Sequence, residues 1–367
     1  MKEDVYRRSL FWSLETGDDD GSNRYLFARV FEYSQEGICI TNPQGNIIYV
    51  NPAFTKTTGY SMAEVLGKNP RILKSGRHSK EFYWKMWRAL TSKGHWKNEI
   101  WNRRKNGEIY PEMLNIHAVL NESGVLTHYV AIFRDITEDM QLRKEVELAG
   151  QIQKNILRGD LDHEKLRMKS IFLPYHHLSG DYYDYRWDEK NLIFRGFLFD
   201  VMGHGVASAL QNSALRVLFR QVVSQRISLP EKVVWMNHEA QAILPADSFA
   251  AGIFFDLDLN NKTLTFVTAG INQFIFFSKK NSLGCEVISQ PGLFLGISEH
   301  AEYEEHVIPF NAGDGMIFLT DGFLDLIREK EYPLHQKDLE SLFQWLKDMG
   351  ESKELKDDGT AISLIHL

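Results

Sequence analysis

The segment FLFDVMGHGVASAL, residues 197–210, joins an apolar run to an aspartate, a glycine-rich turn and a stretch of small helix-forming residues. Asp200 ends the apolar run, and His204 lies between Gly203 and Gly205 in the turn. The pattern predicts a buried strand, a tight turn and a helix. Three kinds of site fit it: a phosphate-binding loop, a catalytic histidine, or a carboxylate that binds a metal ion at the end of a sheet.

Two of these sites lack residues that their chemistry needs. A Walker-type phosphate loop requires GxxxxGK followed by serine or threonine, and no lysine follows Gly205. The dinucleotide pattern GxGxxG is incomplete as well, because its third glycine is absent. His204 has no evident partner for nucleophilic catalysis, and we interpret it as a turn residue or a support for neighbouring ligands rather than as an acid catalyst. A metal-binding role for Asp200 is therefore favoured.

Further acidic residues share the setting of Asp200, at the end of an apolar run or in a turn beside a small residue. They are Asp181 and Asp184 in SGDYYDY, Asp321 in IFLTDGFLDL, and Asp357 and Asp358 in LKDDGTAISL. One such aspartate is usually a turn or cap residue, but four such places in one half of the chain indicate a shared role. Mg²⁺ and Mn²⁺ prefer oxygen ligands from carboxylates, backbone carbonyls and water.

The motifs SGDYYDY, DVMGHGVASAL, TAGINQF, LTDGFLDL and DDGT follow one another over about residues 150–367. In this order they resemble the SpoIIE-type branch of the PPM phosphatases, the protein phosphatase 2C superfamily, as found in bacterial general-stress-response phosphatases. The resemblance implies an αββα sandwich with two Mn²⁺ or Mg²⁺ ions between its sheets. It also implies metal-dependent hydrolysis of phosphoserine or phosphothreonine in a protein, without a covalent phospho-enzyme.

The same resemblance implies the residues of the site. Asp181, Asp200, Asp321 and Asp357 occupy the positions of the catalytic, metal-binding aspartates, with Asp200 bridging both ions. Val201 would contribute its backbone carbonyl. Asp184 and Asp358 would either support these ligands or cap turns. The implied substrate is a phosphorylated anti-anti-sigma factor of the STAS type, in a bacterial partner-switching pathway.

Some positions depart from the family pattern. Ile271 stands where a histidine is common, Gln273 where a proline is common, and Gly359 where a bulkier apolar residue is usual. These departures leave open a catalytically degenerate binding module with the same fold. A nucleotide cyclase is less well supported, because the later TDG and DDGT carboxylates would then have no role. A kinase would need a glycine-rich loop with a paired lysine, which the sequence lacks.

The first part of the chain resembles a PAS sensor domain. The resemblance rests on GICITNPQGNIIYVNPAFTKTTGYSMAEVLGKNPRIL, NRRKNGEIYPE and VAIFRDIT. It implies an antiparallel sheet with flanking helices, and a ligand that is flavin, haem or none. Pro70 takes the place of the cysteine that forms a flavin adduct in light sensors, so that photochemistry is not expected. The side chains considered for a ligand pocket are Trp84, Trp87, Trp96 and Trp101, with His78, His95, His117 and His128 as haem ligands in principle.

Residues 138–157, between the two domains, contain many helix-forming residues and no proline. The stretch is predicted to be a helix with apolar residues along one face. Two sets show the spacing: Leu142, Val146 and Ala149, and Leu148, Ile152 and Ile156. The helix either packs on its own domain or pairs with its copy in a homodimer. LAGQIQKNIL resembles the segment that enters this phosphatase branch and is thought to control the metal site, so Leu148, Ile152 and Ile156 are expected to be regulatory.

The amino-acid composition restricts the partners and the location expected for the chain. The chain has 367 residues, 43% hydrophobic and 25% charged, with a net charge of −7, which does not favour a nucleic-acid partner. The only two cysteines, Cys39 and Cys285, offer no disulfide framework. No apolar run reaches the roughly 20 residues of a membrane span, and the apolar core of a signal peptide is absent. We therefore expect a cytoplasmic protein.

We expect an α+β chain with two domains, a PAS fold and an αββα phosphatase sandwich, joined by a helical linker. The expected division is an N-terminal helix and linker over residues 1–24, a PAS sensor domain over 25–137, a signalling-helix linker over 138–158 and the phosphatase domain over 159–367.

Overall fold

The computed structural model describes residues 21–203, 205–245, 247–280, 284–352 and 354–367. The chain divides into two compact units, Met1–Arg143 and Lys144–Leu367. The helix expected near the N-terminus lies outside the described residues. Within the expected linker, Gly21 opens a helix, α2 (Gly21–Tyr33).

Unit 1 is built on one antiparallel sheet of five strands in the order β2-β1-β5-β4-β3. The strands are β1 (Gly37–Thr41), β2 (Ile47–Val50), β3 (His95–Arg103), β4 (Ile109–Leu120) and β5 (Leu126–Asp135). Alternating buried and half-buried residues in β1 are what a strand covered on one face requires. The mixed fold with an antiparallel, PAS-like sheet is as expected.

Short helices cover this sheet and enclose its core. They are α3 (Pro52–Thr58), α4 (Met62–Val65), the 3₁₀ helix η1 (Pro70–Leu73) and α5 (Lys80–Lys93). Gly59, at φ 76°, ends α3, and a capping box of Ser61 and Glu64 begins α4. A left-handed glycine therefore separates these two helices.

Helix α6 (Thr137–Ile156) crosses the division between the units. Its apolar residues Leu142, Leu148 and Ile152 are exposed, whereas Ile156 packs against the core of unit 2. Its one fully buried side chain is a polar one, Gln153.

Unit 2 contains two antiparallel sheets. The first has the order β14-β11-β10-β9-β8, and the second has the order β13-β12-β15-β16-β7-β6. The strands are β6 (Leu161–His163), β7 (Leu166–Leu173), β8 (Asp181–Asp188), β9 (Ile193–Val201), β10 (Ala250–Asp258), β11 (Thr263–Ala269), β12 (Gln273–Phe277), β13 (Cys285–Ser289), β14 (His306–Pro309), β15 (Gly315–Leu319) and β16 (Gly359–His366).

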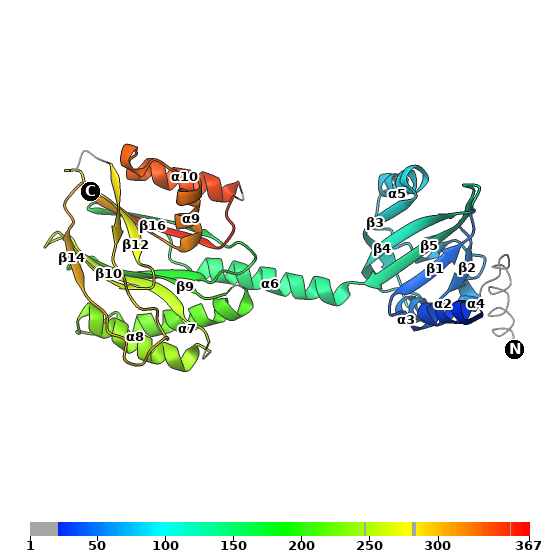
Figure 1. The fold of residues 1–367 in the computed structure, drawn as a ribbon, viewed down its shortest axis with the longest axis horizontal. Coiled ribbons are helices and arrows are strands. Elements are labelled where there is room, and N and C mark those ends of the chain that lie inside the picture. The colour runs from blue at the N-terminus through cyan, green and yellow to red at the C-terminus, as the bar shows by residue number, and fades with distance from the viewer. Residues whose placement is uncertain (1–20, 204, 246, 281–283, 353) are drawn as a thin grey trace. The chain divides into compact units, whose positions relative to one another are not determined.

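Helices cover the outer faces of both sheets of unit 2 (Figure 1). The helices are α7 (Val206–Val222), α8 (Leu229–Ile243), α9 (Asp321–Glu329), η2 (Leu334–Gln336) and α10 (Leu339–Glu351). The first two pack on the first sheet, and α9 and α10 pack on the second. A third apolar cluster, which includes Phe255, Phe274 and Phe318, fills the space between the sheets. Unit 2 is therefore the expected αββα sandwich.

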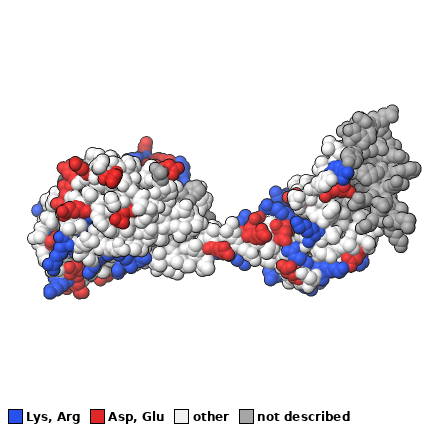
Figure 2. Space-filling model, turned by 90° about the horizontal axis from the view of Figure 1, so that it is seen from below, with Lys and Arg blue, Asp and Glu red and all other residues white. Residues whose placement is uncertain are grey.

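Acidic and basic side chains both occur on each unit on the face shown in Figure 2. Within the described residues, none of the helices combines the length and the apolar character of a bilayer span. Cys39 and Cys285 are both buried and unpaired.

Candidate metal centre

Asp181 and Asp200 face each other on neighbouring strands. Asp181 is the first residue of β8, Asp200 is the next-to-last residue of β9, and the antiparallel register makes them direct partners. The apolar run before Asp200 anchors β9, because Phe197, Leu198 and Phe199 are all fully buried. The strand core thus fixes both carboxylates where the chain leaves the sheet.

Burial and mutual repulsion disfavour ionisation of these acids. Burial, and then the charge of Asp200, raises the pKa of Asp181 well above its usual range. Burial and neighbouring carboxylates, led by Asp321 and then Asp357, raise the pKa of Asp200 to about 7. Burial and Asp357 also raise the pKa of Asp321.

None of the four predicted ligand carboxylates forms an ion pair with a described lysine, arginine or histidine. Acidic groups held together without a cation lose much of their hydration and repel one another. A divalent cation would supply the missing positive charge.

Asp321 and Asp357 come from the second sheet. Asp321 opens α9 directly after β15, and Asp357 lies two residues before β16, which pairs with β15. A Cβ on Gly322 would lie 2.1 Å from the backbone oxygen of Asp358. Only glycine therefore lets the start of α9 approach the segment that carries Asp357, which explains the glycine of the TDG motif.

Thr320 links the two sheets at this point. Its hydroxyl donates a hydrogen bond to Asp181 Oδ2 (2.8 Å) and accepts one from the Thr360 backbone N–H (3.0 Å). Sequence reasoning used the LTDG motif for its aspartate and missed the threonine beside it. Thr320 fixes the orientation of the Asp181 carboxylate from the opposite sheet.

Gly180 is held from three directions. Its N–H donates to Asp358 Oδ2 (2.7 Å), and its carbonyl accepts from the Asn212 side chain and from the Val201 N–H (2.9 Å). Asp358 Oδ1 also accepts from the Tyr175 N–H (2.7 Å). Asp358 thus ties down the loop before Asp181, as a structural cap does. Asn212, on α7, was not predicted from the sequence.

The carbonyl oxygen of Val201 faces the same glycine. A Cβ on Gly180 would lie 2.8 Å from the backbone oxygens of Val201 and Gly203. The absence of a side chain at Gly180 leaves room for the carbonyl of Val201, which is itself fully buried. The role of Val201 as a backbone ligand stays a prediction.

The oxygen ligands available at this site suit ions that keep several bound water molecules. Within the described residues, no three His, Cys, Asp or Glu side chains lie close enough together to hold one ion. Water and backbone carbonyls would therefore complete the coordination of an ion at this site. Mg²⁺ characteristically keeps several waters. The four-aspartate ligand set stays a prediction.

Other predicted residues lie in different surroundings. Asp184 is buried and accepts hydrogen bonds from Arg158 (3.1 Å), Arg216 (3.2 Å) and Arg220 (2.8 Å), so it is part of an ion cluster between β8 and α7. His204 lies outside the described residues.

The departures from the family pattern have packing explanations. Ile271 is buried in the core between the sheets, and Gln273 accepts a hydrogen bond from Arg328 Nη2 (2.7 Å). A Cβ on Gly359 would lie 2.8 Å from Leu355 Cδ1 and 3.2 Å from Phe323 Cε2, so a side chain there would require these neighbours to shift.

Comparisons with known proteins match two parts of the chain to two different families. Residues 35–138 match the family model for the PAS domain, and residues 194–362 match that for stage II sporulation protein E (SpoIIE). A nitrogen fixation regulatory protein of Klebsiella oxytoca is 38% identical over 135 residues, 36% of this chain and 27% of that protein. The phosphoserine phosphatase RsbU of Bacillus subtilis is 23% identical over 205 residues, 56% of this chain and 60% of that protein.

Among solved structures, the SiaA-PP2C domain of Pseudomonas aeruginosa is similar with a TM-score of 0.48 and 18% identity, covering 63% of this chain and 99% of that one. The chain spans less than two thirds of the length of the curated relatives named above.

Proposed function

Because this chain joins a PAS domain to a SpoIIE-type phosphatase domain, we propose that it is a PAS-regulated, metal-dependent protein serine/threonine phosphatase. The observation that carries the proposal is the Asp181–Asp200 pair, two acids opposite each other at strand ends without a cationic partner. Such a pair is costly unless it serves to bind cations. The unpaired state of both cysteines suits the cytoplasm, where we place the activity.

The side chains of the site have two different roles, as ligands and as groups that hold the ligands in position. Asp181, Asp200, Asp321 and Asp357 would hold two Mn²⁺ or Mg²⁺ ions, together with the Val201 carbonyl. When bound, such ions activate water near neutral pH and stabilise charge on phosphoryl oxygens. Thr320 keeps the Asp181 carboxylate oriented, and Asn212 and Asp358 hold Gly180 in place.

An exposed apolar face beside the site favours a protein substrate. Val206, Leu210 and Val217 are 51%, 66% and 52% exposed and lie four and seven residues apart on α7. Met202, 45% exposed, extends this face to the turn that follows Asp200. Exposed apolar groups gathered near a site mark contact surfaces for proteins. We identify the substrate as a phosphorylated STAS-type protein of a partner-switching pathway, as the sequence resemblance implies.

Helix α6 is proposed to regulate the site through Gln153. The Gln153 side chain donates to the Ser179 carbonyl (2.8 Å) and accepts from the Ser179 N–H (3.0 Å). Ser179 precedes Gly180 and Asp181, so a shift of α6 would move the backbone that positions a ligand. Leu148, Ile152 and Ile156 would set the position of the helix, and the PAS domain would bias it.

The exposed residues of α6 support a homodimer. Leu148 and Ile152 are 57% and 54% exposed, which is unusual for large apolar side chains on a regular helix unless they meet a partner. A second copy of α6 would cover them, as in a coiled coil.

The first prediction concerns catalysis. The full chain should release phosphate from a phosphoserine peptide only with Mn²⁺ or Mg²⁺, and Asp200→Asn should lower kcat by about 100-fold or more, because it removes the charge shared by both ions. Asp348→Asn, a matched change of an exposed aspartate on α10, should keep wild-type activity.

A phosphorylated STAS-type protein should be a better substrate than the peptide, and Leu210→Glu should slow only the protein reaction. Failure of the wild type and of residues 144–367 alone to release phosphate at any metal concentration would favour the degenerate binding module instead.

The second prediction concerns Gln153. Gln153→Leu should raise the Mn²⁺ concentration needed for half-maximal activity by about tenfold, since loss of two hydrogen bonds loosens the segment that positions Asp181. Gln151→Leu, an exposed glutamine on the same helix, should leave it unchanged. Saturating Mn²⁺ should restore activity to Gln153→Leu; an unrestorable loss, or no shift at all, would refute the positioning role.

The third prediction concerns assembly. In sedimentation equilibrium the wild-type chain should be a dimer, and Leu148→Glu with Ile152→Glu should weaken association by about tenfold or more, because charges would enter an apolar contact. The double variant Lys144→Glu, Lys154→Glu serves as the control, because it has the same number of substitutions to glutamate on this helix. A monomeric wild type, or a dimer unaffected by the paired glutamates, would show that α6 does not carry the contact.

A further inference from the structure

Three arginines converge on one buried acid where the end of α6 meets α7. Asp184 of β8 is 2% exposed, and its oxygens accept hydrogen bonds from Arg158 Nε (3.1 Å), Arg216 Nε (3.2 Å) and Arg220 Nε (2.8 Å). We call these four residues the arginine cluster. Arginine stays protonated in proteins, so three positive charges surround a single carboxylate. One guanidinium would be enough to pair with Asp184, and the cluster therefore carries surplus positive charge.

The chain segments that carry these arginines contain no acidic residues. Residues 148–159 lead from α6 to Arg158, and residues 201–230 include all of α7; neither segment has an aspartate or a glutamate, although the chain has a net charge of −7. Asp160, the next acid after Arg158, accepts hydrogen bonds from the N–H and the hydroxyl of Ser170 instead (2.9 and 3.0 Å). The positive charge of the cluster is therefore available to attract an anionic partner. The basic residues of the two segments are Lys154, Arg158, Arg216, Arg220 and Arg226.

Two of the three arginines have hydrogen-bond donors to spare. Arg216 is largely buried, and its Nη2 donates to the Ile156 carbonyl at the end of α6 (3.3 Å), so its role is structural. Arg158 and Arg220 are about half exposed and contact Asp184 through Nε alone. Within the described residues, their terminal nitrogens have no acceptor. Asp184 thus holds both guanidinium groups in place and leaves their outer donors free for a ligand.

The arginine cluster lies near the proposed metal centre and the apolar face of α7. Asp184 follows Asp181 by three residues on β8, which corresponds to about 10 Å along a strand. Arg220 follows the exposed Val217 by one turn of α7. A protein that brings a phosphoserine to Asp181 and covers Val217 would therefore also lie against Arg220.

We propose that Arg158 and Arg220 bind acidic side chains of the phosphoprotein substrate and give the enzyme a preference for acidic residues near the phosphoserine. The guanidinium fork suits a carboxylate in geometry as well as in charge. This inference rests on the proposed phosphatase function, but it concerns the choice of substrate and not the hydrolysis step.

Two phosphoserine peptides of equal length test the proposal on the full chain with Mn²⁺. An extended chain advances about 3.3 Å per residue, so one peptide has glutamates three and four residues from the phosphoserine on both sides, and the other has glutamines there. The wild type should hydrolyse the glutamate peptide with a kcat/KM about fivefold or more higher, mainly through KM, because the ion pairs form on binding. Arg220→Gln should reduce this ratio to about twofold or less, while Arg158 and Arg216 still hold Asp184.

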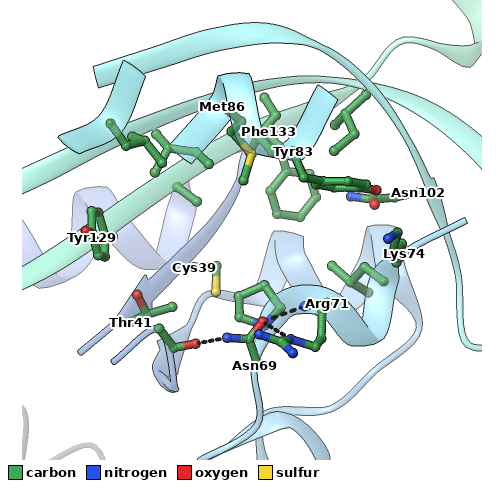
Figure 3. Close-up of a pocket in the computed structure, with 18 of the residues that line it drawn as sticks. Cys39, Thr41, Asn69, Arg71, Lys74, Tyr83, Met86, Asn102, Tyr129 and Phe133 are labelled. Atoms are coloured by element: carbon green, nitrogen blue, oxygen red, sulfur yellow. Dashed lines mark hydrogen bonds between the residues drawn. The ribbon is translucent and has the colours of Figure 1, made fainter. Parts of the chain in front are cut away.

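Arg71→Gln is the matched control. Arg71 is an exposed arginine of unit 1 whose Nε also donates to a side-chain oxygen, Asn69 Oδ1 (3.1 Å; Figure 3). This variant should keep the wild-type ratio. Raising the NaCl concentration from about 0.05 M to about 0.5 M should lower the ratio of the wild type, because salt screens charges at the surface.

Fluorescence anisotropy of the same peptides, labelled and measured in EDTA, separates binding from turnover. The glutamate peptide should bind the wild type about fivefold more tightly than the glutamine peptide, and this difference should also depend on Arg220. Hydrolysis of neither peptide would contradict the proposed function, and the two affinities would then decide the role of the arginine cluster.

The proposal fails if the wild type treats the two peptides equally in kcat/KM and in affinity. A preference that a folded Arg220→Gln chain retains in full would overturn it as well. If Arg220→Gln does not fold, the salt dependence of the wild type decides, and a ratio that stays constant with added NaCl would overturn the proposal.

Discussion

The repulsion between Asp181 and Asp200 is the constraint on which unit 2 depends. The β8–β9 register places the two acids opposite each other, and the apolar run of β9 prevents either from moving out to solvent. Nearby Asp321 and Asp357 increase the unfavourable field at Asp200. Holding such charges together without a cation lowers the stability of the fold, as is common at functional sites. The strand geometry is therefore the basis of the metal binding that we propose.

The same constraint explains why the loop before Asp181 is so firmly held. Gly180 contacts Asp358, Asn212 and Val201, and Ser179 is held by Gln153 of α6. These contacts join both sheets, α7 and the helix that leads out of unit 1. Any input that displaces α6 would therefore reach Asp181, a proposed metal ligand, through two residues of backbone. We propose that this coupling shifts an equilibrium between two positions of α6, and that it does not pass along a chain of many residues.

Local patterns in the sequence located the acids at strand ends and predicted packed sheets, and the family resemblance implied the αββα sandwich. The metal-binding roles of the aspartates stay predictions. The sequence was not sufficient for Thr320, which meets Asp181 across 139 residues, or for Gln153 and Asn212, whose partners lie 26 and 32 residues away in the sequence. The short strands β6 and β14 are too brief to show a period, and α9 was missed because its first residue was treated as a strand end.

Thermal unfolding of unit 2 in the full chain, at pH 8 with EDTA or with Mn²⁺, tests the central claim most directly. If repulsion at Asp200 is relieved by cations, Asp200→Asn should unfold at a higher temperature than the wild type in EDTA. A difference of 1 kcal/mol corresponds to roughly 2–4 °C for a domain of this size. Mn²⁺ should raise the unfolding temperature of the wild type and have little effect on the variant. A variant less stable than the wild type in EDTA, or a wild type that does not respond to Mn²⁺, would contradict the account.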